Sequence, residues 1–401
     1  MNRKYVILAT VLLIVLISLS LFLAVNVLKK QTATSPFYVG VEFAYGSQFS
    51  QLKALVDKVE NYSNLIVIGS IDLTFNRTAL DESCDYIFNS GLNFIVLFTS
   101  YTMYNASNGW GSYTIFDWIV AARQKYGDQF LGIYRFDEPG GNQLDKTQFM
   151  LINNTSTFSY PDNPTGYAEV SEGYVGYLTA MLDNYFIRTN YTTKIFTADY
   201  GLYWFDYNGS YNAVFGEFLV NQSSISKQLT IALDRGAAES FNRNWGIILT
   251  YSSLEPPYLE NGTAMLQDML TSYHAGATYI VVFDYPTYPA TNPYGILSQD
   301  QFSAMENFWN QIHSNPSSFD SSKARVAYVV PENYGFGFRN PDDTIWGLFP
   351  ADGVSSKIWN DTEFLLGKYG TNLNIIYDEP GVIDPTLKDY EKVFYWNQTI
   401  T

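Results

Sequence analysis

The stretch FLGIYRFDEPGG, residues 130–141, combines a buried-strand pattern with two carboxylates and a turn signal. Residues 130–136 form a short, mostly apolar run without two-residue alternation, which is typical of a strand buried on both faces in a parallel sheet. Pro139 and the two glycines after it then end the strand. The pattern predicts that Asp137 and Glu138 lie at the carboxyl-terminal edge of a parallel sheet. Enzymes built on parallel barrels place their catalytic residues at this edge.

The same kind of apolar run recurs along the chain, and amphipathic segments separate the runs. The predicted strands cover residues 37–45, 65–69, 93–99, 130–136, 194–199, 213–220, 245–251 and 278–284. The predicted helices cover residues 48–60, 80–89, 115–126, 171–188, 225–241, 263–274 and 301–313. Alternation of this kind predicts an α/β fold, a (β/α)₈ TIM barrel. Residues 200–212 are too short and turn-rich for an ordinary fifth helix, so that unit is degenerate or the strand count is wrong by one.

The barrel is predicted to occupy residues 37–316 and to be followed by a serine-rich linker. Residues 323–401 predict a small C-terminal α/β domain, with strands at 325–330, 373–377 and 392–396 and a helix near 361–368. Its loop at residues 332–346 is rich in glycine and aromatic side chains. This loop suits either ligand binding or packing onto the barrel.

The first thirty residues differ from the rest of the chain. Residues 5–28 are almost unbroken apolar sequence between two pairs of basic residues, and as a helix they would span roughly 36 Å. A cleaved signal peptide is the alternative, but its apolar region is usually shorter. We predict an uncleaved N-terminal transmembrane helix, a signal anchor within residues 1–30, followed by a linker at 31–36.

Asn-x-Ser/Thr sequons indicate on which side of the membrane the chain lies. They are more frequent than the Ser and Thr content explains, and they begin at Asn61, Asn76, Asn105, Asn153, Asn154, Asn190, Asn208, Asn221, Asn261, Asn360 and Asn397. Such sequons accept glycans in exported proteins. The expected location is therefore the cell membrane, with a single-pass anchor and a glycosylated ectodomain outside.

Composition narrows the chemistry further. The net charge of −16 argues against a nucleic-acid partner, because such binding needs a basic surface. With two histidines and one cysteine, a Ser-His-Asp triad, a Cys-His dyad or a His-rich zinc site is not expected. Aromatic residues make up 17% of the chain, and exposed Tyr and Trp suit stacking on sugars. Carboxylates must carry most of any proton transfer.

Several carboxylates are predicted to converge where the barrel strands end. Glycoside hydrolysis needs two such groups, one as acid and one as nucleophile or base, and requires no metal or cofactor. We predict Glu138 as the acid/base, with Glu255 slightly ahead of Glu217 as its catalytic partner. The predicted substrate-binding residues are Glu42, Asp137, Asp284, Tyr285 and Tyr251. A carbohydrate is the expected ligand, and the sequence leaves the oligomeric state open.

The strand that ends in Asp137-Glu138-Pro139 resembles the acid/base strand of clan-A-type TIM-barrel glycoside hydrolases. A small α/β domain after the barrel is similar in layout to the amidotransferase-like domain of family 42 β-galactosidases. The resemblance implies a glycosidase barrel with Glu138 as its acid/base. In that family Asn usually precedes this Glu, whereas this chain has Asp137. The C-terminal unit contains no thiol, so amidotransferase chemistry is not implied.

A second copy of the triplet, Asp378-Glu379-Pro380, follows a predicted strand in the C-terminal unit. Asp followed by X-Pro-Gly is also simply a good way to end a strand. Two other classes of function therefore stay open. One is a non-catalytic carbohydrate-binding or envelope-structural surface protein on the same barrel. The other, less favoured, is a solute-binding protein with two similar lobes.

Overall fold

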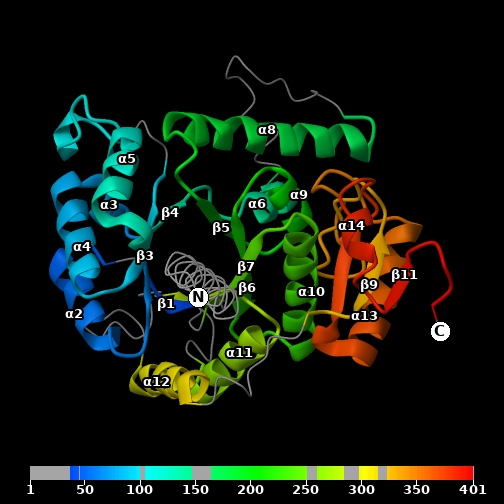
Figure 1. Ribbon diagram of the computed structural model, residues 1–401. Helices are drawn as coiled ribbons and strands as arrows, with labels where there is room; N and C mark the ends of the chain where they lie inside the picture. The colour runs from blue at the N-terminus through cyan, green and yellow to red at the C-terminus, as the bar shows by residue number, and fades with distance from the viewer. Residues whose placement is uncertain are drawn as a thin grey trace, which may run out of the picture. The chain divides into compact units, whose positions relative to one another are not determined.

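The computed structural model describes residues 37–44, 46–99, 104–146, 164–250, 260–283, 298–314 and 323–400. Within these ranges eight parallel strands pair in chain order, and β1 pairs with β8 to close a barrel (Figure 1). The strands are β1 (Tyr38–Phe43), β2 (Leu65–Ile68), β3 (Asn93–Leu97), β4 (Phe130–Tyr134), β5 (Ile195–Asp199), β6 (Ala213–Leu219), β7 (Asn244–Thr250) and β8 (Tyr279–Phe283). The predicted TIM barrel is confirmed, and the closed barrel does not have the two lobes of a solute-binding protein.

All seven helices predicted for the barrel are present, and the described residues contain three further short α-helices. The helices are α2 (Phe49–Val59), α3 (Ile71–Phe75), α4 (Arg77–Asn89), α5 (Ile115–Tyr126), α6 (Pro139–Lys146), α8 (Tyr167–Arg188), α9 (Tyr203–Asn208), α10 (Ser224–Ser240), α11 (Gly262–His274) and α12 (Gln299–Ser314). The three further helices are α3, α6 and α9. The short helix α9 is the degenerate fifth unit, so the predicted strand count is right. Its residues 203–207 are buried, which anchors this helix despite its length.

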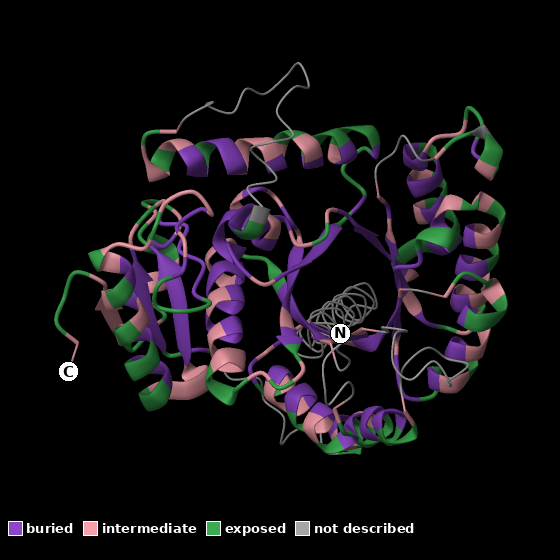
Figure 2. Ribbon diagram, turned by 180° about the vertical axis from the view of Figure 1, so that it is seen from behind, coloured by how far each residue is buried: buried purple, intermediate pink, exposed green. Residues whose placement is uncertain are grey.

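The barrel strands are coloured as buried over most of their length (Figure 2), and their apolar side chains form a hydrophobic core inside the barrel. Phe196, Phe215 and Tyr279 bring their rings together, with centroid separations of 5.4–5.8 Å. Tyr38 stacks on Tyr279 at 5.1 Å. These aromatic side chains fill the end of the barrel where the strands begin. The carboxylates Glu42, Glu138 and Glu217 lie at the opposite end, where the strands finish.

The C-terminal part forms a three-stranded parallel sheet in the order β10-β9-β11. Its elements are β9 (Val326–Val330), α13 (Gly353–Tyr369), β10 (Leu373–Tyr377), α14 (Asp384–Leu387) and β11 (Lys392–Tyr395). All three predicted strands are present, and the predicted helix is longer at its start. Asp352 caps it by accepting the N–H groups of Val354 and Ser355, which fixes where the helix begins.

Helix α10 serves the barrel and the C-terminal sheet at once, lying between β6 and β10 (Figure 1). A Cβ atom on Gly236 would lie 2.4 Å from the Ile375 carbonyl oxygen, so only glycine allows this approach. The adjacent Arg235 is buried and donates to the Asn374 side chain and to the carbonyls of Ala275, Thr371 and Leu373. Residues 38–401 accordingly group as one compact unit.

The second Asp-Glu-Pro triplet also belongs to this contact. Glu379 accepts hydrogen bonds from the Trp204 indole at 2.7 Å and from the Asn208 amide at 3.2 Å, both on the barrel helix α9. The triplet therefore ends β10 and ties the C-terminal sheet to the barrel. Glu379 is not among the described lining residues of the barrel-mouth cavity, so the two copies of the triplet hold different positions.

In the ranges that the structure describes, no helix is long and apolar enough to cross a membrane. The anchor predicted within residues 1–30 lies outside these ranges.

Replacing Gly236 with alanine tests the close contact of α10 with β10. The added methyl group meets backbone, which cannot rotate away, so we expect Gly236→Ala to lower the free energy of unfolding by about 1–3 kcal/mol. Gly367→Ala is the matched control, because nothing lies within 4 Å of a Cβ at this exposed position in α13. It should raise stability by about 0.5–1 kcal/mol. Urea unfolding of both variants checks this, and equal stabilities would contradict it.

Candidate active site at the barrel mouth

A cavity of about 630 Å³ opens at the mouth of the barrel, the end where the strands finish. Its size suits a small-molecule site. Its carboxylates come from four strands or the turns after them, and they are Glu42, Asp72, Asp137, Glu138 and Glu217. No Lys, Arg or His is among its described lining residues. The cavity is therefore suited to a neutral or cationic ligand with hydroxyl groups, and unsuited to an anion.

Glu138 and Glu217 form the centre of this site. Glu138 follows β4, Glu217 lies near the end of β6, and a hydrogen bond joins their carboxyl groups. Burial raises the pKa of Glu217 well above its ordinary value of 4.5, and the charges of Glu138 and Asp137 raise it further. Two neighbouring carboxyl groups cannot both ionise easily, so Glu217 keeps its proton above its ordinary pKa.

Asp137 is held in place by Tyr134, which lies in the barrel interior. The Tyr134 hydroxyl donates to Asp137 Oδ1 at 2.5 Å and accepts from the Ala198 N–H at 2.9 Å. Asp137 stays accessible to solvent inside the cavity, yet burial among the surrounding protein raises its pKa while the Tyr134 bond lowers it. Asp137 is thus oriented by the core, with its carboxyl group at the cavity.

The turn that carries both acids is backbone-strained. Phe136 and Glu138 have positive φ angles of 57° and 51°, a conformation that costs about 1–3 kcal/mol per non-glycine residue. The neighbouring strand holds the turn, because Thr197 Oγ1 donates to the Phe136 carbonyl and the Glu138 N–H donates to the Ala198 carbonyl. Strain that surrounding structure maintains is common at functional sites.

Asp199, at the end of β5, explains the two glycines after Pro139. Its carboxylate accepts the N–H groups of Gly140 at 2.5 Å and Gly141 at 2.8 Å, which are the first turn of α6. Burial raises the pKa of Asp199 to about 7, while these N–H groups lower it. A Cβ on Gly140 would lie 2.3 Å from the Gly201 carbonyl oxygen, so the approach needs glycine.

A second cavity, of about 420 Å³, shares Glu138, Glu217 and Leu219 with the first. The barrel contributes one part of its lining, including Tyr200 and Gln222. The C-terminal part contributes Gly337, Phe338, Arg339 and Trp359. Phe338 is itself buried, so the aromatic loop predicted at residues 332–346 both packs on the barrel and lines a cavity.

The structure thus brings together part of the predicted site. Glu42, Asp137, Glu138 and Glu217 line one cavity, whereas Glu255, Asp284, Tyr251 and Tyr285 lie outside the described residues. Sequence reasoning missed Tyr134 and Asp199. It also left out of the site the residues that the C-terminal part contributes to the second cavity, which are Gly337, Phe338, Arg339 and Trp359. The rule that found Glu138, a carboxylate at a strand end, also applies to Asp199, which closes the predicted strand 194–199.

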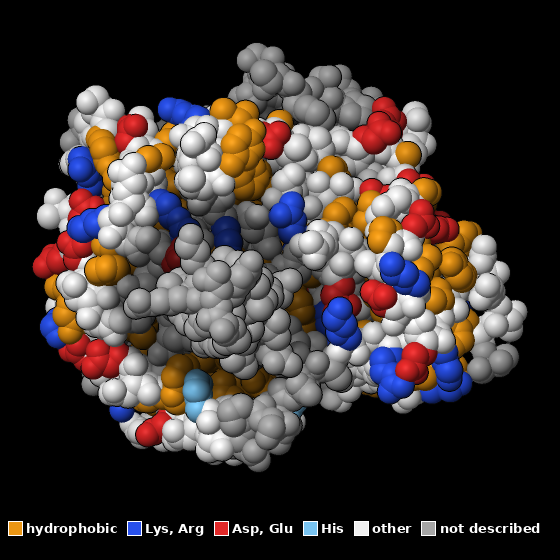
Figure 3. Space-filling model, in the orientation of Figure 1, with side chains coloured by type: hydrophobic (Ala, Val, Ile, Leu, Met, Phe, Trp, Pro, Cys, Tyr) orange, Lys and Arg blue, Asp and Glu red, His pale blue; other side chains and the backbone are white. Residues whose placement is uncertain are grey.

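The surface outside the site carries mixed charge. Figure 3 shows acidic and basic side chains interspersed over one face, without a continuous basic patch.

No family model matches the sequence, and no curated protein matches it. Solved structures with a similar fold include an α-L-fucosidase isoenzyme from Paenibacillus thiaminolyticus, at TM-score 0.50 and 10% identity, covering 89% of this chain and 59% of that protein. They also include a family 1 β-glucosidase from Thermotoga maritima, at TM-score 0.40 and 9% identity, covering 69% and 97%.

A third similar structure, the spore coat polysaccharide biosynthesis protein SpsE of Bacillus subtilis, has TM-score 0.40 and 9% identity and covers 72% and 71%. TIM-barrel glycoside hydrolases are thus among the solved proteins that share this architecture. Of these three structures, only the fucosidase reaches a TM-score of 0.50, and at 10% identity it supports the fold alone.

The raised pKa of Glu217 predicts a pH effect on stability. A carboxyl group whose pKa is higher in the folded than in the unfolded protein stabilises the fold below the unfolded pKa, and this share is lost as pH rises through the folded pKa. We therefore expect wild type to lose stability relative to Glu217→Gln as pH rises above about 4.5. Urea unfolding of both proteins between pH 4 and 8 measures the difference, and a pH-independent difference would contradict the shift.

Proposed function

We propose that the protein is a glycoside hydrolase that cleaves a neutral glycan with Glu138 and Glu217 as its two carboxyl groups. The observation that carries the proposal is that both side chains line one cavity at the barrel mouth and interact with each other there. One carboxyl group must hold a proton and the other must be ionised for this reaction, and a pair of which one member keeps its proton meets both needs.

The roles within the pair follow from where the proton resides. Burial favours the neutral form of Glu217, so Glu217 is the general acid in the empty site and Glu138 is the nucleophile. The sequence-based prediction assigns Glu138 as the acid because it follows β4. The raised pKa of Glu217 favours the opposite assignment. Asp137, fixed by Tyr134, lies next to the reacting centre and is available to accept a substrate hydroxyl.

The direct interaction of the two carboxyl groups favours retention of configuration. Inverting enzymes hold their carboxyl groups about 6.5–9.5 Å apart so that a water molecule fits between them, whereas retaining enzymes hold them about 5–5.5 Å apart. Groups that share a hydrogen bond are too close for the inverting arrangement. Proton NMR of the first-formed product anomer distinguishes the two outcomes.

The test of the catalytic pair uses the repeated triplet as its own control. We expect Glu138→Gln and Glu217→Gln each to lower turnover on a glycan panel by about 10²–10⁴-fold. Glu379→Gln changes the same residue of the second triplet, which lies outside the cavity, and should keep most of the wild-type turnover, because Gln retains an acceptor oxygen for the Trp204 indole. Equal turnover by wild type and Glu138→Gln would remove Glu138 from the mechanism.

Leaving-group dependence separates the two roles. A variant without its general acid should still release a good leaving group such as dinitrophenolate, because that group needs no proton. A variant without its nucleophile should be inactive on every substrate. If Glu138→Gln rather than Glu217→Gln keeps activity on a dinitrophenyl glycoside, the roles are reversed.

The site also suits a carbohydrate-binding protein that does not catalyse a reaction. The carboxylates and the nearby Trp359 would contact a sugar whether or not its bond is cleaved. The same panel decides between them. Binding by calorimetry without turnover would favour the non-catalytic function.

We also propose that residues 5–28 anchor the chain in the cell membrane with the remainder outside. The apolar run and the sequons support this location. Of the sequon asparagines that the structure describes, eight are exposed, and they are Asn61, Asn76, Asn105, Asn190, Asn221, Asn261, Asn360 and Asn397. Asn208 is half-buried, and its amide donates to Glu379.

Glycan occupancy follows from these contacts. We expect peptide mass spectrometry of the protein from its native membranes to find glycans at exposed sequons and none at Asn208. A glycan there would replace an amide hydrogen that Glu379 uses and would require the C-terminal sheet to separate from α9. A modified Asn208, or a fully unmodified chain, would contradict the prediction.

A further inference from the structure

The second cavity meets the first at the catalytic pair. Glu138, Glu217 and Leu219 line both, and the remaining lining of the two cavities differs. A bond that Glu138 and Glu217 attack would therefore lie where the two cavities join. A substrate with one unit in each cavity would place its connecting bond between the carboxyl groups.

The C-terminal part is fixed firmly enough to form a binding surface. Arg235 and Glu379 tie its sheet to the barrel helices α10 and α9. The Gln143 amide donates to the Trp346 carbonyl at 2.9 Å, which joins the loop before α13 to the helix that follows the catalytic turn. The cavity wall is thus held in register with Glu138, as a specific subsite requires.

The chemistry of the second cavity matches a sugar ring. Trp359 and Phe338 supply aromatic surface, and Tyr200, Gln222 and Ser226 supply groups that hydrogen-bond to hydroxyls. Sugar rings carry apolar C–H faces and polar edges, so a cavity with both kinds of lining fits them. Trp359 is half-buried and therefore retains accessible surface.

The charge in this cavity indicates a neutral sugar. Arg339 is its basic residue among the described lining, and its guanidinium is paired with Asp343, with bonds at 2.7 and 2.8 Å, and with Asp145. The positive charge is already compensated by two carboxylates. An acidic sugar would also lie beside the negative charge that the Glu138–Glu217 pair carries, which repels it.

We propose that the C-terminal part forms a second sugar subsite, with Trp359 stacking on a neutral sugar unit that is released when the bond at Glu138 and Glu217 breaks. This inference rests on the proposed function, and it defines the substrate as a glycan of at least two neutral units. The C-terminal sheet is then part of substrate recognition as well as of the fold.

The experiment compares substrates that do and do not need the second cavity. A glycosyl fluoride fills the first cavity, and its small leaving group needs no second subsite. A disaccharide of the same sugar fills both. We expect Trp359→Ala to lower kcat/KM on the disaccharide by roughly tenfold, as removal of a central aromatic contact does, and to leave the glycosyl fluoride unchanged.

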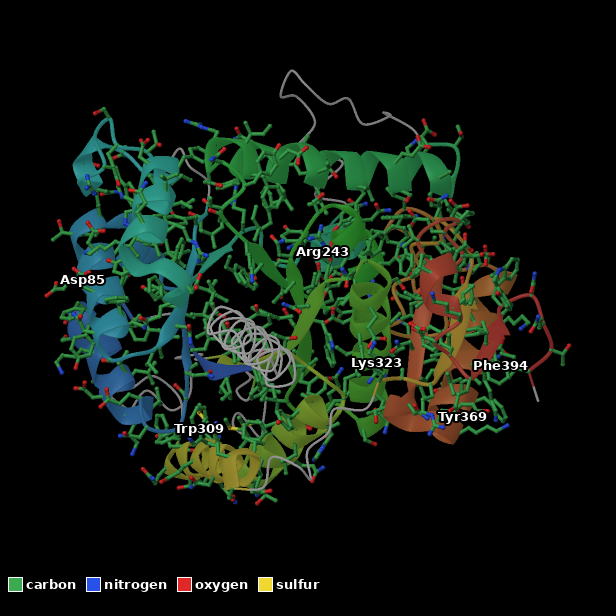
Figure 4. The ribbon with its side chains drawn as sticks, in the orientation of Figure 1. Asp85, Arg243, Trp309, Lys323, Tyr369 and Phe394 are labelled. Atoms are coloured by element: carbon green, nitrogen blue, oxygen red, sulfur yellow. The ribbon has the colours of Figure 1, made fainter. Side chains whose placement is uncertain are left out.

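Trp309→Ala is the matched control. Trp309 is likewise half-buried, but it lies on α12 against His313, away from the C-terminal sheet (Figure 4). It should leave both substrates unchanged. An equal loss on both substrates in Trp359→Ala, or no loss on either, would overturn the subsite.

Failure of the proposed function gives a different result. If wild type hydrolyses neither substrate, the catalytic assignment fails, and calorimetry with the same disaccharide decides the subsite. Binding that Trp359→Ala weakens and Trp309→Ala does not would retain the subsite in a carbohydrate-binding protein. Absent binding, or binding that Trp359→Ala leaves intact, would overturn it.

Discussion

The carboxylate of Asp199 holds the geometry on which the site depends. It accepts the first N–H groups of α6 and so fixes the turn that carries Asp137 and Glu138. Helix N-termini leave such groups without partners, and a buried carboxylate both satisfies them and complements the helix dipole. The residues around Glu138 maintain its strained φ angle once Asp199 has fixed the turn. The carboxyl group of Glu138 then reaches Glu217 on β6.

A second constraint joins the barrel to the C-terminal sheet. Gly236 lets α10 approach β10, and Arg235 satisfies backbone carbonyls from both sides of the contact. A buried guanidinium is tolerated only when its donors are paired. The same helix follows β6, the strand that carries Glu217. The position of the second cavity relative to the catalytic pair is therefore fixed by the contacts that stabilise the fold.

Local pattern was enough to predict the barrel, the order of its strands and the carboxylates at their ends. These features follow from apolar runs and turn residues, which act over a few positions of sequence. The two Asp-Glu-Pro triplets show the limit of this reasoning. Both end a strand, but Glu138 interacts with the carboxyl group of Glu217, two strands away in the barrel, whereas Glu379 accepts hydrogen bonds from Trp204 and Asn208. Identical local sequence therefore does not indicate which side chains each glutamate contacts.

The sequence by itself determined that this chain is a TIM barrel with acidic groups at its mouth and little His or Cys to serve instead. Only the tertiary structure decided that Glu138 meets Glu217, that Tyr134 orients Asp137, and that Trp359 and Arg339 line a cavity beside them. The physical reason is distance along the chain. Burial, hydrogen bonding and pKa depend on residues that folding brings together from far apart, and no local pattern records which ones they are.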